Sequence, residues 1–305
     1  MPSEFRGPLS LGYLLARLSD TIADAGSIDQ ARRQALLEQF RSLLSAPAKH
    51  RDTQKFACAL PGELEGSGLE RGEWDLVLRA ADCFDWLDMM DRKVGRHIRK
   101  VVGIITGGQN WDLQRFAGDA VVRLAEDDEL ETYAYQVAGC VGEFWTEIGF
   151  TCSDRFAREE RATLLRWGAN YGKGLQLVNI LRDVPEDLAR GRCYLPGSGS
   201  VEAEVLGAEL PRWQSRAREL LADGLRYTAA LHGSRLRMST GLPALLGGRT
   251  LDRLESASWA DLEKRVKISR GEVKWSLWGA YARSAPWLPG SWKSEDRRAC
   301  QRLAS

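Results

Sequence analysis

The sequence predicts an all-α fold. No segment shows the sustained alternation of apolar and polar residues, bounded by hairpin turns, that marks a half-buried strand. Apolar residues recur instead at helical spacing along most of the chain. With 305 residues, 44% of them hydrophobic, the chain can bury a large core. Because no low-complexity run, linker or fixed-period repeat divides it, we expect one domain over residues 1–305.

The first third of the chain predicts two helices and then a connection. Residues 8–24 predict an apolar helix with a proline in its first turn. Ser27 or Asp29 can cap an amphipathic helix that ends near residue 44. Residues 45–70 contain two prolines and several glycines, so we expect a partly irregular connection there.

The rest of the chain predicts longer helices. They are expected over residues 73–90, 92–116 with an interruption near Gly107, 129–150, 158–183 with Pro185 bending or ending it, 201–232 and 236–246. In the third of these, Ala138, Gly139 and Gly142 would let another helix or a ligand approach the backbone closely. Residues 286–305 form a mostly polar tail.

The composition argues against several classes of protein. Basic and acidic residues balance (43 against 42), so a nucleic-acid-binding surface has no global support. The six cysteines show no CxxC pair and no metal-ligand spacing, which predicts free thiols in a reducing cytosol. There is no signal-peptide pattern and no run of about 18 apolar residues. We therefore expect a cytoplasmic protein without a membrane span.

A polar stripe runs along the helix that precedes residue 190. Gln176, Asn179, Asp183 and Asp187 follow one another at steps of three, four and four, which places them on one helical face. The positions between them are mostly apolar, as in a helix buried in an interior. Carboxylates projecting from a buried helix need a cationic partner, and a divalent metal is the simplest one.

The first helix repeats this pattern. Tyr13, Arg17, Asp20 and Asp24 follow at steps of four, three and four along one face. Two carboxylate pairs that face each other across a cavity would form an oxygen-only site. Mg²⁺ prefers such sites and shares its remaining positions with phosphate oxygens. Metals held in this way promote the departure of a diphosphate.

Several cations near these carboxylates in sequence could complete a diphosphate clamp. They are Arg17, Lys173, Arg182, Arg190 and Arg192. Simpler explanations exist for each feature, because a single DxxxD pair is commonly a solvated helix face. Arg190 and Arg192 can be surface charges on a loop, and Tyr13 can be ordinary core packing.

The chain resembles the squalene/phytoene synthase family at several separate places. The segments GKGLQLVNILRDVPEDLARGRCYLP and YLLARLSDTIAD look like its two aspartate-rich signatures. YAYQVAGCVGEFW looks like its tyrosine-containing central helix, and GLPALLGGRTL with VKISRGEV looks like its C-terminal region. The resemblance covers roughly residues 5–280.

This resemblance implies an isoprenoid synthase fold, with helices around a central cavity, and a set of residue roles. It implies Mg²⁺ ligands at Asp20, Asp24, Asp183 and Asp187, and diphosphate-binding arginines at Arg17, Arg182 and Arg192. It implies that Tyr133 acts in the first half-reaction and Tyr13 in the second, and that Gln176 and Asn179 lie beside the reacting carbons. It also implies that Val137, Ala138 and Val141 line a prenyl channel.

The implied reaction joins two farnesyl diphosphates head to head through presqualene diphosphate. Squalene synthases then use NADPH to deliver a hydride, whereas phytoene-type enzymes lose a proton. The segment VAGCVGEFW looks more like bacterial squalene synthases, which favours squalene over dehydrosqualene or phytoene. A non-catalytic scaffold or assembly factor is a further alternative, although all four aspartates are retained.

Two departures from the family pattern bear on activity. The helix that family members usually carry before the first aspartate motif is missing, and Ala23 stands where many relatives have a further acidic residue. No nucleic-acid or obligate protein partner is expected. Trp287 and Trp292 in the polar tail suggest loose contact with the inner face of a membrane, which suits a water-insoluble product.

Overall fold

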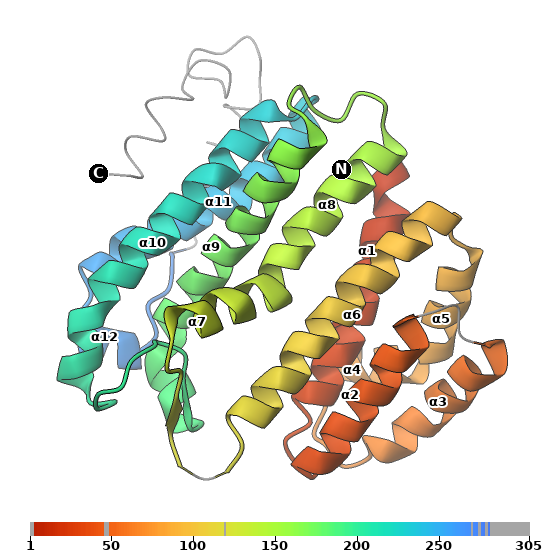
Figure 1. The fold of residues 1–305 in the computed structure, drawn as a ribbon, viewed down its shortest axis with the longest axis horizontal. Helices are drawn as coiled ribbons and strands as arrows, with labels where there is room; N and C mark the ends of the chain where they lie inside the picture. The colour runs from red at the N-terminus through yellow and green to blue at the C-terminus, as the bar shows by residue number, and fades with distance from the viewer. Residues whose placement is uncertain are drawn as a thin grey trace. The chain divides into compact units, whose positions relative to one another are not determined.

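The structure is a computed structural model that describes residues 3–45, 49–118, 120–269, 271–273, 276–277 and 280. The predicted polar tail and its two tryptophans lie outside these residues. The described residues form two compact units, which are treated separately below. Unit 2 contains residues 3–117 and 147–152, and unit 1 contains the other described residues. Both units are almost entirely helical, which confirms the predicted all-α class (Figure 1).

Unit 2 is built on α6, which packs against α1 and α2. Its core includes the rings of Phe40, Phe56 and Phe84, whose centroids lie 5.9–6.3 Å apart. These rings come from three different helices and hold them together by apolar burial. The helices are α1 (Ser3–Ala23), α2 (Gln30–Ser45), α3 (His50–Glu63), α4 (Arg71–Leu78), α5 (Ala80–Met89) and α6 (Arg92–Arg115).

Unit 2 corrects several predicted boundaries. The first helix begins at Ser3, so its proline lies inside it, and Asp29 caps α2 by accepting the Arg32 N–H at 3.2 Å. The predicted irregular connection contains α3, whose buried positions follow helical spacing and outweigh its proline. The predicted helix over residues 73–90 is two helices that meet at Arg79. The helix expected to break near Gly107 is continuous.

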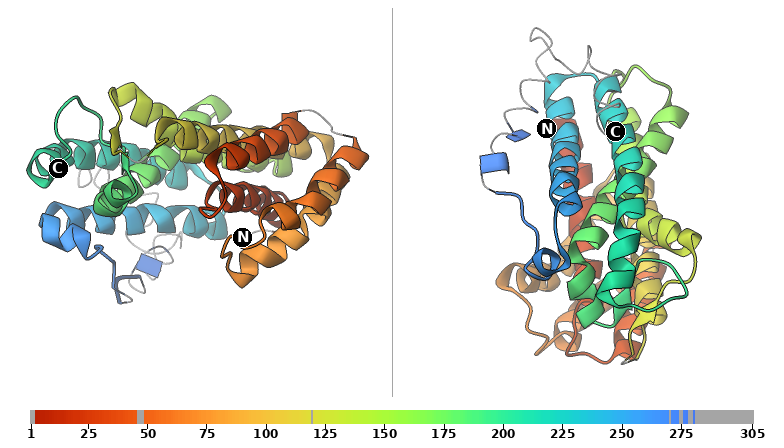
Figure 2. Two further views of the ribbon diagram at one scale, coloured as in Figure 1. Left: turned by 90° about the horizontal axis from the view of Figure 1, so that it is seen from below. Right: turned by 90° about the vertical axis from the view of Figure 1, so that its left-hand side faces the viewer.

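In unit 1, α9, α10 and α11 pack side by side, as Figure 2 shows from a second direction. The elements are α7 (Asp127–Ala134), the π-helix η1 (Tyr135–Gly139), α8 (Cys140–Cys152), α9 (Arg161–Ala189), α10 (Ala203–Ala230), α11 (Ser234–Glu255) and α12 (Trp259–Glu263). The last six residues of α8 belong to unit 2. α9 continues through Pro185 to Ala189, so the helix does not end at this proline. Proline removes only one backbone hydrogen bond, and the helix extends one more turn.

Two short strands were not predicted. β1 (Val122–Arg123) pairs in parallel with β2 (Arg192–Cys193), and strands of two residues carry no periodic signal. The Arg123 guanidinium donates to the carbonyls of Leu195 (2.9 Å) and Pro196 (3.0 Å). Because Arg123 lies in β1, these hydrogen bonds hold the segment that follows β2 against β1.

Glycines bring α9 into backbone contact with η1 and α8. A Cβ added to Gly142 would lie 1.9 Å from the carbonyl oxygen of Gly168 on α9. A Cβ added to Gly172 would lie 2.2 Å from the carbonyl oxygen of Ala138. The predicted close approach at these small residues is therefore confirmed, and a neighbouring helix provides it.

Candidate functional site

Asp20 and Asp24 lie at the C-terminal end of α1 in unit 2. Asp24 is the first residue after the helix, and its N–H donates to the Asp20 carbonyl at 2.8 Å. The Asp20 carboxylate accepts a hydrogen bond from Nε2 of Gln109 on α6. Burial raises the pKa of Asp20 to about 6, and the charge of Asp24 adds to this increase. Arg17 and Gln109 oppose the increase without cancelling it, so a further cation would be favourable here.

Tyr13 and Arg17 occupy the preceding turns on the same face of α1. Nη2 of Arg17 donates to Oε1 of Glu73 on α4 at 2.6 Å, so its guanidinium is already paired with a carboxylate. Tyr13 is 67% exposed, which is incompatible with the alternative that it is ordinary core packing. Unit 2 thus brings together the four polar residues predicted on this helix, together with two partners that were not predicted.

Asp183 and Asp187 lie in the last two turns of α9 in unit 1. Arg182 donates to both Asp183 oxygens, from Nε to Oδ1 at 2.9 Å and from Nη2 to Oδ2 at 2.5 Å. This hydrogen bonding raises the pKa of Arg182 although burial opposes it. Nε of Arg265 lies 3.3 Å from Oδ1 of Asp183. Two guanidinium groups therefore converge on one carboxylate at the end of α9.

Arg265 reaches this carboxylate from an unusual backbone conformation. It has a φ of 62°, in the left-handed region that residues other than glycine rarely adopt. Such a conformation costs on the order of 1–3 kcal/mol and persists only where the surroundings hold it. Nη1 of Arg265 also lies 3.6 Å from Glu186, so two carboxylates on α9 hold the side chain.

The other predicted residues of the stripe differ in their surroundings. Gln176 is half-buried and Asn179 is exposed on α9, while Arg192 is half-buried in β2. Arg190 is exposed and pairs with Glu186 at 2.8 Å, four residues earlier, as its reading as a surface charge predicted. Of the four residues of the stripe, Gln176, Asp183 and Asp187 are thus half-buried and Asn179 is exposed.

Tyr133 is half-buried on α7 and stacks on Tyr194, which follows β2. The ring centroids lie 4.9 Å apart with planes 16° from parallel, and the Tyr133 hydroxyl donates to that of Tyr194 over 3.4 Å. Because Arg123 fixes the segment after β2, the ring that supports Tyr133 is also fixed. Tyr133 can present the electron-rich face of its ring or a hydroxyl to a substrate, the two capacities expected of it.

An apolar cavity of about 310 Å³ lies in unit 1 between η1, α8, α9, α10 and α11. The three residues predicted to line a prenyl channel, Val137, Ala138 and Val141, form part of its wall. Two tyrosines in the wall have their hydroxyls satisfied: Tyr171 donates to the Thr240 carbonyl at 2.7 Å, and Tyr227 bonds Thr146 at 2.8 Å. Burial raises the pKa of both tyrosines, so they remain neutral. The volume is near the lower end of the range of about 300–1,000 Å³ for small-molecule sites.

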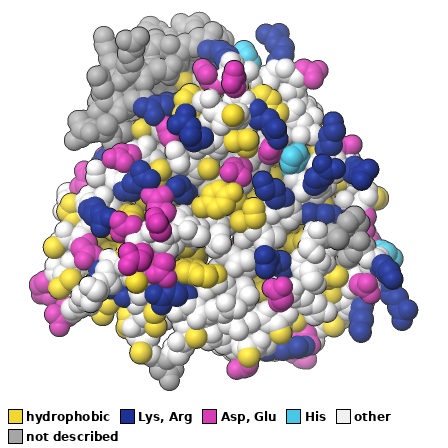
Figure 3. All heavy atoms as spheres, in the orientation of Figure 1, with side chains coloured by type: hydrophobic (Ala, Val, Ile, Leu, Met, Phe, Trp, Pro, Cys, Tyr) yellow, Lys and Arg dark blue, Asp and Glu magenta, His cyan; other side chains and the backbone are white. Residues whose placement is uncertain are grey.

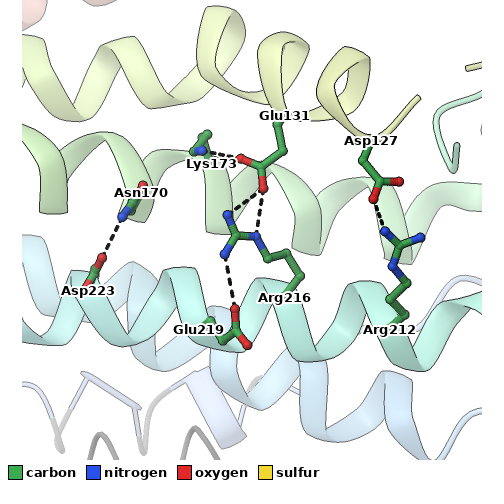
Figure 4. A network of polar contacts seen from close by, with 8 residues as sticks. All are labelled: Asp127, Glu131, Asn170, Lys173, Arg212, Arg216, Glu219 and Asp223. Atoms are coloured by element: carbon green, nitrogen blue, oxygen red, sulfur yellow. Dashed lines mark hydrogen bonds and ion pairs between the residues drawn. The ribbon is translucent and has the colours of Figure 1, made fainter. Parts of the chain in front are cut away.

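A network of ion pairs joins α7, α9 and α10 in unit 1 (Figure 4). Glu131 accepts hydrogen bonds from Lys173 on α9 and from Arg216 on α10, the latter at 2.8 Å from Nε. Burial alone would raise the pKa of Glu131, but its two cationic partners outweigh burial and lower it. Lys173 was predicted to belong to the diphosphate clamp; its ammonium instead binds the helix that carries Tyr133.

The donors near Asp20 fit a hard cation. Oε1 of Gln109 is buried and has no hydrogen-bond partner, while the other end of the amide binds Asp20. Carboxylate and amide oxygens are ligands that Mg²⁺ accepts. Within the described part of the chain, no three His, Cys, Asp or Glu side chains converge as a metal-binding group. Asp20 and Asp24 belong to unit 2, and Asp183 and Asp187 belong to unit 1.

Five partners of the site were missed from the sequence: Glu73, Gln109, Glu131, Tyr194 and Arg265. Gln109 lies 89 residues from Asp20, and Glu131 lies 42 residues from Lys173, so no local spacing relates them. Only Arg265 could have been suspected from the sequence, because it directly precedes the segment VKISRGEV, which resembles the C-terminal region of the family.

Comparison with known proteins agrees with these features. Phytoene synthase 3 of Zea mays is 32% identical over 184 residues, which are 56% of this chain and 42% of that protein. Phytoene synthase of Thermus thermophilus is 33% identical over 164 residues, 50% of this chain and 53% of that protein. The matched segments span about half the length of these relatives.

Among solved structures, TcSQS in complex with a ligand superposes with a TM-score of 0.71 at 19% identity. The superposition covers 100% of this chain and 90% of TcSQS, and at this identity the likeness concerns the fold alone. No described helix is sufficiently long and apolar to cross a membrane. The family model for squalene/phytoene synthases matches residues 1–272, a range that includes residues of both units. The chain therefore belongs to the squalene/phytoene synthase family, whose members are prenyltransferases that bind prenyl diphosphates.

Proposed function

We propose that this protein condenses two molecules of farnesyl diphosphate head to head, through presqualene diphosphate, in a Mg²⁺-dependent reaction. The observation that carries the proposal is the arrangement along α9. Residues from Gly168 to Leu175 form the wall of an apolar cavity, and Asp183 and Asp187 follow on the same helix. Leu175 and Asp183 are eight residues apart, about 12 Å along the axis. A substrate with a charged head and a long apolar tail needs this separation.

Each part of the chain has a role in the proposed reaction. Arg182, Arg192 and Arg17 would donate hydrogen bonds to diphosphate oxygens, and Arg265 would join them. The cavity wall, including Val137, Ala138 and Val141, would hold the prenyl chain and exclude water from the carbocation. Tyr133, supported by Tyr194, would stabilise the cation through its ring or relay the proton that is lost. Tyr13, Gln176 and Asn179 would contact the substrate in the later steps.

By the family resemblance, Asp20, Asp24, Asp183 and Asp187 would hold the metal. When bound, Mg²⁺ would neutralise the diphosphate and assist its departure. Substrate binding would require the paired cations to change or share their partners. Arg17 would have to leave or share Glu73 to reach a diphosphate, and Arg182 and Arg265 would have to share Asp183 with the metal. With such an exchange of partners, the charge of each carboxylate would be balanced by a cation both before and after substrate binds.

Two candidate functions differ in their product: squalene, or dehydrosqualene or phytoene. The likeness of VAGCVGEFW to bacterial squalene synthases supports reduction by NADPH to squalene. The named sequence relatives are phytoene synthases, which favours dehydrosqualene or phytoene without reduction. The two strands of the described chain are two residues long and form no βαβ dinucleotide-binding unit, so no residue is assigned to NADPH. Cytoplasmic location, with loose contact to the inner face of a membrane, belongs to the same proposal.

Incubation with farnesyl diphosphate and Mg²⁺, with and without NADPH, followed by lipid extraction, tests the reaction. Squalene formed only with NADPH supports the first candidate. Dehydrosqualene, or phytoene from geranylgeranyl diphosphate, formed regardless of NADPH supports the second. No turnover of either substrate would overturn the enzymatic proposal and favour the scaffold.

A substitution separates the metal role from folding. Asp183→Asn should abolish diphosphate release while leaving the helical fold intact, as circular dichroism would show. Asp252→Asn, at a 64% exposed side chain on α11 that also pairs with an arginine, serves as the control and should keep full turnover. Normal turnover of Asp183→Asn would contradict the role given to this residue.

A further inference from the structure

A second concave site lies in unit 2, on the groove formed by α2, the end of α5 and the first half of α6. It has a volume of about 660 Å³. Five of its lining residues are cationic, namely Arg41, Arg92, Arg96, Arg99 and Lys100, and one is a carboxylate, Asp88. None of the residues assigned to the proposed reaction lines it.

The positive charge is concentrated by α6 itself. Residues 92–100 contain five Lys or Arg and no carboxylate, in a chain whose net charge is +1. Arg92, Arg96 and Arg99 follow at steps of four and three, so they stack along one face of the helix. Figure 3 shows Lys and Arg side chains gathered on the right of the face, where α5 and α6 lie in Figure 1.

Among the five cations that line the groove, Arg99 differs from Arg92 and Arg96 in its exposure and its pairing. Arg99 is 15% exposed and donates to Asp88 at 2.6 Å, which neutralises the single lining carboxylate. Arg92 and Arg96 are exposed, and neither has an ion-pair partner among the described residues. Their charges are therefore available to an anionic ligand.

The groove also has an apolar component. Leu87 and Met90 at the end of α5 and Ile104 on α6 contribute to its lining. Met89, beside them in sequence, is 77% exposed. A site for a small soluble anion needs no apolar surface, whereas the surface of a lipid bilayer presents phosphates directly above acyl chains.

We propose that this groove is the surface by which the protein docks on membranes that contain anionic phospholipids. The guanidinium groups of Arg92 and Arg96 would donate paired hydrogen bonds to headgroup phosphates, and Met89 would enter the acyl boundary. Basic residues close to an anionic membrane contribute about 1 kcal/mol each, which corresponds to roughly fivefold in partitioning. The docking site is thus in unit 2, independent of the polar tail.

Flotation of the full chain with vesicles of phosphatidylcholine and phosphatidylglycerol tests the proposal. The protein should float with these vesicles, remain in the soluble fraction with pure phosphatidylcholine, and dissociate as salt rises well above about 0.15 M, because screening shortens the range of the charges. Arg92→Glu with Arg96→Glu should weaken binding at least about 25-fold, since two attractive charges are lost.

The matched control is Arg71→Glu with Arg235→Glu. Both arginines are exposed, Arg71 at 96% of its side chain, and the change in net charge is the same. This variant should bind like the wild type. Equal loss in both variants, no binding of the wild type, or equal binding to pure phosphatidylcholine vesicles would overturn the proposal.

Two further measurements complete the test. The first asks whether the recognised phosphate belongs to a lipid or is free in solution, and the second asks whether docking is independent of turnover. Inorganic phosphate at millimolar concentration should not displace the protein from vesicles beyond the effect of equal ionic strength; specific displacement would overturn the lipid assignment. The flotation assay contains no prenyl substrate, so it does not depend on the proposed reaction. Turnover of the Arg92→Glu/Arg96→Glu variant in detergent solution should equal that of wild type, and its loss would contradict a purely docking role.

Discussion

Gly172 permits the closest contact between α9 and the π-helix, and replacing it with alanine gives the most direct test of the packing in unit 1. An added Cβ would lie 2.2 Å from the Ala138 carbonyl oxygen, 2.7 Å from its carbon and 2.9 Å from Cα of Gly139. All three atoms are backbone, so no side chain can rotate away. Since ordinary contacts of a Cβ begin near 3.4 Å, α9 and η1 must separate by about 1 Å.

The expected change in the free energy of unfolding of Gly172→Ala results from two opposing effects. Alanine is favoured over glycine inside a helix by roughly 0.5–1 kcal/mol, whereas overpacking of this kind costs about 1–3 kcal/mol. Gly207→Ala on α10 is a matched control, because a Cβ there meets nothing within 4 Å and only the favourable effect remains. The two variants should therefore differ in free energy of unfolding by about 1–3 kcal/mol. With an unfolding entropy of about 2.1 cal/mol/K per residue, this corresponds to roughly 2–5 °C in Tm.

Thermal unfolding followed by circular dichroism measures this difference directly. Ala138 belongs to the wall of the apolar cavity, so the same displacement should also lower turnover of Gly172→Ala, whereas Gly207→Ala should keep it. If Gly172→Ala melts at or above the temperature of Gly207→Ala, the close backbone contact between α9 and η1 is wrong.

Three other predictions concern single side chains. In metal-free buffer, the raised pKa of Asp20 means that its charged form opposes folding: the free energy of unfolding should fall by on the order of 3 kcal/mol as pH rises from about 4 to above 6. Asp20→Asn should flatten this slope and remove any rise in Tm on adding Mg²⁺, as melts in chelator across this pH range would show. Glu131→Gln should destabilise the protein by about 1–3 kcal/mol, because two cations lose their shared partner, whereas Glu219→Gln, at a 60% exposed side chain, should cost less than about 0.5 kcal/mol in urea unfolding. Tyr133→Phe should lower turnover by at least about 100-fold if the hydroxyl relays a proton, and unchanged turnover at an unchanged Tm would assign the role to the ring.

Helices with a long, regular pattern were the predictable part of this fold. The apolar positions of α1 and α9 recur over five turns or more, so both helices and their polar faces could be located from spacing alone. The prolines inside two of the helices do not end them. Pro61 lies in the last turn of α3 and Pro185 lies near the end of α9, positions where one lost backbone bond does not end a helix.

The site was predictable only where its members are neighbours along one helix. Asp183 and Arg182 share a turn of α9, and their association could be expected from sequence. Arg265 meets the same carboxylate from 82 positions further along the chain, through a left-handed backbone conformation that has no signature in a non-glycine residue. Likewise, Gln109 reaches Asp20 only because α6 packs on α1. Such pairs depend on tertiary packing, which the periodicity of either helix leaves undetermined.

The π-helix has a consequence for insertions and deletions in this family. The N–H of Cys140 donates to the carbonyl of Tyr135, five residues earlier, so η1 contains one residue more than an α-helix of the same rise would hold. Deleting one residue from Tyr135–Gly139 would therefore restore regular α-helix and leave the faces of α7 and α8 in register. A deletion elsewhere in α7 or α8 would turn every following side chain by about 100°. Length variation among relatives in this part of the chain should accordingly concentrate within these five positions.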